Sequence, residues 1–176
     1  TSYEVYLRDS CGPGDASVWI GPISFTTRCM PVTVPFIENF DGPSFSHINS
    51  TSIGTIDPCW ERTLAPSFSW KGGGPGSRYF SGTGTASDHT TASGGFVFTS
   101  YRSSGQPVDS AWLETPPIDL NGLNVPQLTF FVHMYGSAIK HLKTYVNNGS
   151  GWVAIDTIVG SQQSSSGSAW KEINVS

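Results

Sequence analysis

Residues 142–158 read Leu-Lys-Thr-Tyr-Val-Asn-Asn-Gly-Ser-Gly-Trp-Val-Ala-Ile-Asp-Thr-Ile. Apolar and polar side chains alternate over 142–146 and again over 152–158, which is the period of a β-strand with two different faces. The Asn148-Gly149 step between the two runs is typical of a tight hairpin, because a type I′ turn needs positive φ at both central residues. This stretch therefore predicts an antiparallel hairpin.

The same two-residue period recurs along most of the chain, and no segment keeps the 3.6-residue period of a helix for three turns. Clusters rich in glycine and proline separate the alternating runs, as turns do in β proteins. About ten short strands at regular spacing predict an all-β fold, an antiparallel β-sandwich or jelly roll. The further predicted strands are 3–8, 23–27, 68–70, 96–98, 111–114 and 128–135.

Composition argues against several classes of function. Charged residues make up 12% of the chain and the formal net charge is −4, so we expect no nucleic-acid partner, which would require a basic stripe. No run of eighteen apolar residues is present, and the sequence predicts no membrane span. The first residues read as a strand rather than a signal peptide, so we expect further sequence to precede them in an extracellular protein.

A proline-rich stretch, Met30-Pro-Val-Thr-Val-Pro35, divides the chain. Each proline fixes φ and favours an extended residue before it, so residues 30–35 are predicted to form a stiff linker. Residues 1–29 form a predicted β-hairpin, and residues 36–176 form the main domain. Because an isolated two-stranded hairpin is only marginally stable, we interpret residues 1–29 as the end of a domain whose other strands lie upstream.

The hairpin contains Tyr3-Glu-Val-Tyr-Leu-Arg-Asp9 and Trp19-Ile-Gly-Pro-Ile-Ser-Phe-Thr-Thr27. These two segments resemble the last two strands of a fibronectin type III domain, of the kind found in secreted modular bacterial proteins. The resemblance implies that the chain belongs to a larger polypeptide with other domains.

A series of motifs runs in order through the main domain. The most specific are Asp88-His-Thr90, followed by a glycine and an aromatic strand, and the strand that ends at His133-Met-Tyr-Gly136. The others are Glu38-Asn-Phe-Asp41, Cys59-Trp60, Phe68-Ser-Trp70, Gly82-Thr-Gly84, Gly94-Gly-Phe-Val97 and Ala111-Trp-Leu-Glu-Thr-Pro-Pro117. From about residue 34 to 176 they resemble a MAM domain, the adhesive jelly-roll module of receptor phosphatases, meprin-type proteases and many bacterial secreted proteins. The family's closing strands, with a paired-aspartate motif, are not among these residues.

The resemblance also implies a site for an ion. Asp41 and Asp88 match positions where the family places ion-binding or structural carboxylates. Hard cations take several oxygen ligands, so we predict one structural calcium or sodium ion held by Asp41 and Asp88. The alternative is that both carboxylates cap turns through hydrogen bonds to the backbone.

No catalytic motif stands out. The sequence contains no HExxH, GxSxG or phosphate-binding loop, and its four histidines are widely scattered. MAM domains are non-catalytic, so the resemblance too implies that this chain is not an enzyme. Thirteen carboxylates leave an acid–base pair open.

The three cysteines are Cys11, Cys29 and Cys59. Cys11 and Cys29 fall at opposite ends of the predicted hairpin strands, too far apart for a bridge that tolerates at most about 7 Å between Cα atoms. Cys29 and Cys59 flank the opening of the main domain, as the first two cysteines of MAM domains do, so the resemblance implies a Cys29–Cys59 disulfide. Cys11 would then have its partner elsewhere.

Six tryptophans are available for packing or for binding. The resemblance places Trp60, Trp70 and Trp112 at core positions, whereas Trp152 and Trp170 are less constrained and are the predicted anchors for a ligand. We expect an adhesion module of a secreted protein that binds protein or glycan ligands. Two alternatives stay open: an accessory domain of a secreted hydrolase, above all a peptidase, and a carbohydrate-binding module, which would need a row of exposed aromatic residues.

Overall fold

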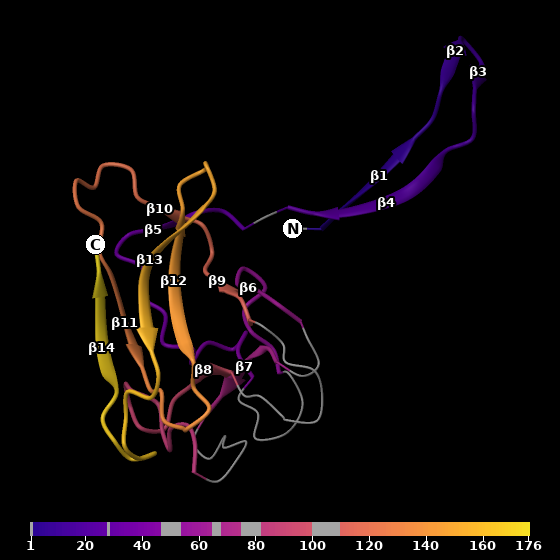
Figure 1. Cartoon of the computed structure of the whole chain (residues 1–176). Helices are drawn as coiled ribbons and strands as arrows, with labels where there is room; N and C mark the ends of the chain where they lie inside the picture. Colours follow the sequence, from indigo (N-terminus) through magenta and orange to yellow (C-terminus); the bar gives the residue numbers. More distant parts are fainter. Residues whose placement is uncertain (1, 28, 47–53, 65–67, 75–81, 100–109) are drawn as a thin grey trace.

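The computed structural model describes residues 2–27, 29–46, 54–64, 68–74, 82–99 and 110–176. Within these ranges the regular structure consists of fourteen β-strands and no helix (Figure 1). The predicted all-β class is therefore confirmed. It also follows that no described segment is a helix of the length and hydropathy needed to cross a membrane.

Residues 142–158 form the predicted hairpin. Strand β12 (His141–Asn147) pairs antiparallel with β13 (Trp152–Val159), and a β-bulge follows Thr144. The bulge inserts one residue, Ile155, into β13, and such an insertion bends and twists a strand.

The turn of this hairpin differs from the prediction. The loop between the strands has four residues, 148–151, and Asn148 does not adopt a positive φ, so the type I′ turn is wrong. The side-chain oxygens of Asn147 and Asn148 accept hydrogen bonds from the Gly149 and Ser150 amides. These Asx-type contacts satisfy the backbone of a wider loop.

A second antiparallel ladder joins β11 (Leu128–Val132) to β14 (Lys171–Val175). The predicted strand 128–135 ends early, because the Gln163 side chain replaces a strand partner beyond residue 132. Its Oε1 accepts a hydrogen bond from the Met134 amide, and its Nε2 donates to the Val132 carbonyl. Strand β14 was not predicted, since Lys-Glu-Ile-Asn-Val has only two apolar side chains.

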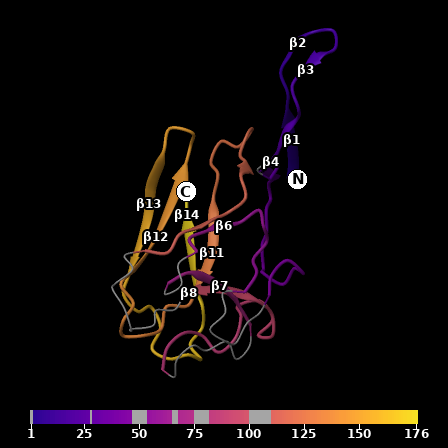
Figure 2. The same ribbon diagram turned by 90° about the vertical axis from the view of Figure 1, so that its right-hand side faces the viewer.

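The core lies between these two ladders, which run side by side in Figures 1 and 2. Val132, Met134 and Ile158 are its buried residues. Partly buried apolar side chains from β11, β12, β14 and the β11–β12 connection surround them: Phe130, Leu142, Ile173 and Ile139. The two ladders are thus held face to face by apolar burial, as in a β-sandwich.

Two short antiparallel ladders also belong to the main domain. Strand β7 (Trp70–Gly73) pairs antiparallel with β8 (Phe96–Thr99), and β6 (Glu61–Arg62) pairs antiparallel with β9 (Leu113–Glu114). Gly73 is required by packing, because a Cβ there would lie 2.8 Å from the ring of Phe98.

The proline-rich segment 30–35 contributes to the main domain. Its residues Val32–Thr33 form β5, which pairs in parallel with β10 (Ile118–Asp119). The Val32 amide also donates a hydrogen bond to the Pro117 carbonyl. This segment is extended, and it adds backbone hydrogen bonds to the domain that follows it.

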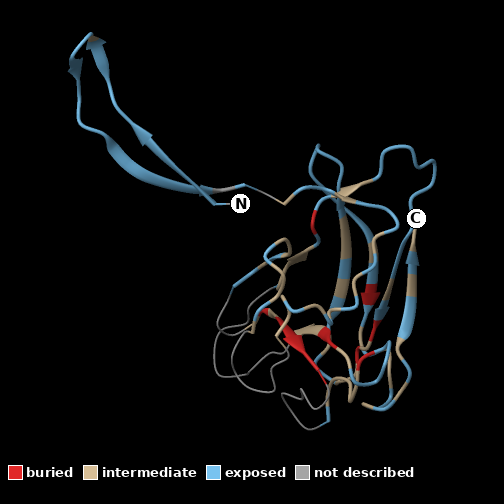
Figure 3. Cartoon of the chain, turned by 180° about the vertical axis from the view of Figure 1, so that it is seen from behind, coloured by how far each residue is buried: buried red, intermediate tan, exposed pale blue. Residues whose placement is uncertain are grey.

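The N-terminal hairpin consists of β1 (Ser2–Leu7) and β4 (Ile20–Thr26), with β2 (Ser10–Gly12) and β3 (Asp15–Ala16) at its tip. It extends away from the main domain in Figures 1 and 2, and its strands are exposed (Figure 3). The pairs Tyr3↔Phe25, Val5↔Ile23 and Leu7↔Ile20 place six apolar side chains on one face. These side chains are 36% to 67% exposed, so the face has no cover within the described chain.

Candidate functional site

Asp88 organises the turn that follows it. The residue is 5% exposed, and its carboxylate accepts hydrogen bonds from the backbone amides of Thr90, Thr91 and Gly94, each at 2.8 Å. Burial by itself raises the pKa of Asp88, but these amides and the Thr91 hydroxyl outweigh that effect and hold the pKa below its ordinary value. Asp88 therefore stays ionised and caps its own turn.

Asp41 reaches the same segment from a distant part of the chain. Its Oδ1 accepts a hydrogen bond from the Gly95 amide at 2.5 Å, and its Oδ2 accepts one from the Asn39 side chain at 2.9 Å. A Cβ at Gly94 would lie 2.5 Å from Asp41 Oδ1, so only glycine fits there. Asp88 and Asp41 thus accept hydrogen bonds from the amides of two consecutive residues, Gly94 and Gly95.

These contacts limit what the two carboxylates can give to an ion. A carboxylate offers about four lone-pair positions; Asp88 uses three on amides, and Asp41 uses two on its nitrogen partners. Among the residues that the structure describes, no cluster of three or more His, Cys, Asp or Glu side chains has a metal-binding arrangement. An ion here would need backbone or hydroxyl oxygens as further ligands, and the calcium or sodium ion stays a prediction.

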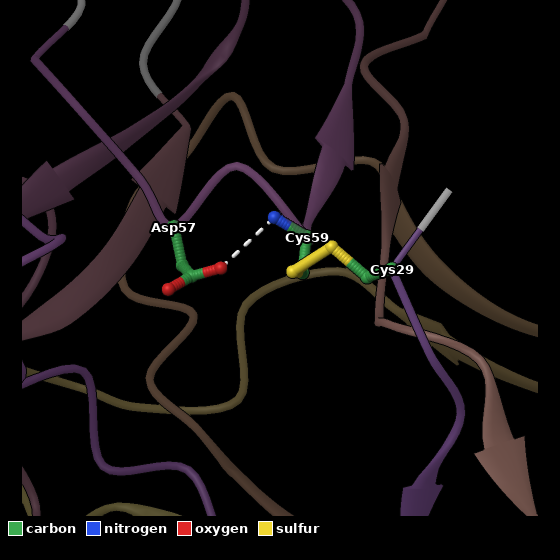
Figure 4. The surroundings of a disulfide bond; sticks show 3 residues. All are labelled: Cys29, Asp57 and Cys59. Atoms are coloured by element: carbon green, nitrogen blue, oxygen red, sulfur yellow. Dashed lines mark hydrogen bonds between the residues drawn. A yellow bond between two sulfur atoms is a disulfide. The ribbon is translucent and has the colours of Figure 1, made fainter. Parts of the chain in front are cut away.

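The implied disulfide is present (Figure 4). Cys29 and Cys59 are bonded with their Cα atoms 5.5 Å apart, across a sequence separation of 30. The Asp57 carboxylate accepts a hydrogen bond from the Cys59 amide at 2.9 Å. Cys11 is a free, exposed cysteine. The bond ties residue 29, where the chain enters the main domain, to Cys59 just before β6, and Asp41 lies in the loop that it closes.

Trp170 lies at the centre of an aromatic cluster beside the Asp88 turn. Its ring contacts Phe96, His133 and His89 at centroid distances of 6.1, 5.7 and 6.4 Å. Its Nε1 donates a hydrogen bond to the Ser87 carbonyl at 3.2 Å. The predicted ligand anchor Trp170 is therefore a packing residue, which holds the Asp88 turn against β8 and against His133.

His133 is the ionisable member of this cluster. Both of its ring nitrogens are buried, and neither makes a hydrogen bond to the described residues. Burial lowers the pKa of His133, and the backbone groups of Ser168 and Ser165, which lie near the ring but outside hydrogen-bond geometry, offset this only in part. His133 is thus held neutral in a packed environment rather than presented to a substrate.

The hairpin β12–β13 has one covered and one open face. The paired residues Leu142 and Ile158 point into the core, and side chains alternate along a strand. The opposite face, which we call the outer face, therefore consists of His141, Lys143, Tyr145, Asn147, Trp152, Ala154, Thr157 and Val159. All of these are exposed except Tyr145, which is half-buried.

Trp152, the second predicted anchor, lies on this outer face. Trp112 contacts it almost perpendicularly, at a centroid distance of 4.9 Å and an angle of 81°, and contacts Tyr145 at 5.1 Å. Trp152 keeps 43% of its surface exposed. Lys143 and Tyr145 were not predicted to be binding residues, although their two-residue spacing in β12 already places them on one face.

The other tryptophans of the main domain are partly buried. Trp70 donates a hydrogen bond from Nε1 to the Ala111 carbonyl at 3.1 Å, and the ring of Trp60 packs on Phe40 at 5.4 Å. These contacts agree with the core positions that the family resemblance implied.

Comparison with known proteins places this arrangement in a family. The model of the MAM domain, meprin/A5/mu, matches residues 50–176. No solved structure matches the chain significantly. The matched region contains the Asp88 turn, the Trp170 cluster and the outer face, so the chain belongs to the MAM domain family, whose members are extracellular, non-catalytic adhesion modules that mediate protein interactions.

Proposed function

We propose that this chain is an adhesion module of a larger secreted protein and that it binds protein or glycan ligands through the outer face of β12–β13. The observation that carries the proposal is the 43% exposure of Trp152 on the outer face, although Trp112 packs against one side of its ring. Binding energy at protein surfaces concentrates on a few anchors, and tryptophan is the most enriched residue type among them.

The surroundings of Trp152 suit that task. Trp112 contacts the ring from the side and fixes its orientation, while 43% of Trp152 is left open. A side chain that is already ordered loses little conformational entropy when a ligand binds. The Trp170 ring, in contrast, is enclosed by three other rings.

We also propose that other domains of the same polypeptide adjoin this module. The support is the apolar face of the β1–β4 hairpin, with Tyr3, Val5 and Leu7 opposite Phe25, Ile23 and Ile20, all substantially exposed. Strands that cover this face would remove six apolar side chains from water, which is the main driving force of folding. The resemblance to the end of a fibronectin type III domain stays a prediction.

One structural calcium or sodium ion near Asp41 and Asp88 completes the proposal. Its support is the convergence of both carboxylates on residues 94 and 95. An ion there would connect the segment held by Cys29–Cys59 to the Asp88 turn and would stiffen the end of the domain opposite to Trp152's loop.

The test uses beads coated with the chain, added to surfaces that carry extracellular protein or polysaccharide. We expect adhesion by the wild type and its loss in Trp152→Ala. The matched control is Trp19→Ala, since Trp19 is also exposed, at 60%, but lies on the N-terminal hairpin. Equal adhesion by both variants would remove the outer face from the account, and hydrolysis of a peptide or glycoside by the wild type would contradict a non-catalytic module.

A further inference from the structure

We propose that the outer face of β12–β13 binds an acidic polysaccharide, a polymer whose sugars carry carboxylate or sulfate groups. The inference rests on the proposed function, because it names the class of ligand for the same face. Three features of the face carry it: the sign of its charges, the combination of an aromatic ring with polar groups, and its size.

The charge of the outer face is opposite to that of the whole chain. The outer face has no Asp or Glu. Apart from Tyr145, its ionisable side chains are Lys143 and His141, which are basic. The carboxylate of this hairpin, Asp156, pairs with Thr144 and therefore lies on the covered face. No described residue forms an ion pair with Lys143, and the adjacent Lys140 is exposed as well. In a chain with a formal net charge of −4, this strip thus carries the Lys143 cation and no carboxylate, and a local positive charge attracts anions.

The same strip combines a ring with hydrogen-bonding groups. Trp152 offers an apolar surface held in place by Trp112. Its cross-strand partner Asn147 and the hydroxyl of Thr157 lie on the same face. A sugar ring needs this pairing of an apolar contact with a small number of polar contacts that fix its orientation.

The size of the face favours a polymer chain over a folded protein. Seven residues at about 3.4 Å per residue make it roughly 24 Å long, and two strands at about 4.8 Å spacing make it roughly 10 Å wide. The resulting area, about 240 Å², is well below the roughly 800 Å² that each partner contributes to a standard protein interface. A polysaccharide is one sugar wide and can lie along such a strip.

The experiment is native gel electrophoresis of the chain in gels that contain one polymer each. The polymers are polygalacturonate, which carries carboxylates, heparin, which carries sulfates and carboxylates, neutral dextran, and poly-glutamate, an acidic peptide. We expect polygalacturonate or heparin to retard the protein and dextran to have no effect. Retardation by heparin without polygalacturonate would assign the contact to sulfate. Retardation should weaken when the salt concentration rises from about 50 to about 300 mM, because salt screens exposed charges.

Variants locate the effect. We expect Lys143→Gln and Trp152→Ala each to weaken retardation by about fivefold or more, as the loss of a binding anchor does. Lys171→Gln removes the same charge from β14 and should change nothing. Circular dichroism of each variant confirms the fold before the comparison.

Four results would overturn the proposal: no retardation by either acidic polymer at low salt, an equal loss in Lys171→Gln, retardation by dextran that Lys143→Gln leaves intact, or equal retardation by poly-glutamate, which would indicate acidic peptides. If these results coincide with adhesion that still depends on Trp152, the polysaccharide is wrong and the adhesion module stands. If Trp152→Ala adheres as well as the wild type, both the polysaccharide ligand and the binding role of the outer face are wrong.

Discussion

Trp170 and Trp152 both belong to aromatic clusters of the same sandwich, but the clusters differ in what encloses them. Trp170 is surrounded by Phe96, His89 and His133, and its indole nitrogen is bonded to Ser87. Trp152 has one ring contact, with Trp112, and 43% of its surface is exposed. The sequence pattern around the two tryptophans does not distinguish them. The difference in their exposure comes from the side chains that pack against each one.

The difference indicates that one end of this domain stabilises the fold and that the other is available for binding. At the Trp170 end, aromatic packing combines with the hydrogen bonds of Asp88 and Asp41. At the Trp152 end, an open strand face carries polar and cationic groups. We therefore expect substitutions at the first end to change stability and substitutions at the second to change binding.

The largest effect is expected for Trp170→Ala. Removal of a packed tryptophan leaves a cavity and costs about 3–5 kcal/mol, and here it also leaves the Ser87 carbonyl without its partner. The free energy of unfolding from urea titration measures the loss. Trp170→Phe, which keeps part of the ring contact, should lose less. A loss below 1 kcal/mol in Trp170→Ala would show that this cluster does not hold the domain together.

The next effect concerns the disulfide. Replacement of Cys29 and Cys59 together by serine opens a loop with a sequence separation of 30, which the chain-entropy account values at about 3–4 kcal/mol. Cys11→Ser is the matched control, because Cys11 is free and exposed, and it should leave the unfolding free energy unchanged. A large loss in the control would mean that Cys11 has a structural role.

Asp88→Asn tests the hydrogen bonds of the turn beside the Trp170 cluster. The variant keeps the shape but loses the charge that three amides bind, so we expect a loss of about 1–3 kcal/mol at pH 7. Because the folded pKa of Asp88 lies below its unfolded value, its contribution is complete above the unfolded pKa, about 3.9, and disappears as the pH falls through the folded pKa. Urea titrations of both proteins should therefore converge at low pH. A constant difference down to pH 2 would contradict this assignment.

Calcium gives a smaller effect. An ion that binds only the folded chain stabilises it by mass action, by about 1.4 kcal/mol at ten times its dissociation constant. We expect millimolar calcium to raise the melting temperature relative to a chelator, and Asp41→Asn to abolish the shift. An unchanged melting temperature in the wild type would exclude calcium, and a separate sodium titration would then test the other ion.

The sequence predicted the long, regular elements well. The runs in β1, β4, β12 and β13 alternate over at least five residues, and each forms a strand. Strand β14 escaped prediction because its charged and polar residues dominate its two apolar ones, and its pairing with β11 supplies what its own pattern lacks. The end of β11 depends on the side chain of Gln163, thirty-one residues from Val132, and no local pattern reports such a contact.

The candidate site was predictable in part. Family motifs selected Asp41 and Asp88, and the fold brings both to residues 94 and 95. The separation of Trp152 from Trp170 required the structure, because burial of an aromatic residue depends on which distant rings pack against it. Lys143 became a candidate only when the pairing of β12 with β13 assigned it to the open face.

The most direct test of this division is the free energy of unfolding of Trp152→Ala, measured by urea titration beside Trp170→Ala. Trp152 has one aromatic contact, and such a pair contributes about 0.5–1.5 kcal/mol, so we predict a loss of about 1 kcal/mol against about 3–5 kcal/mol for Trp170→Ala. Equal losses in the two variants would contradict the account, because Trp152 would then be a packing residue and any loss of adhesion would follow from unfolding.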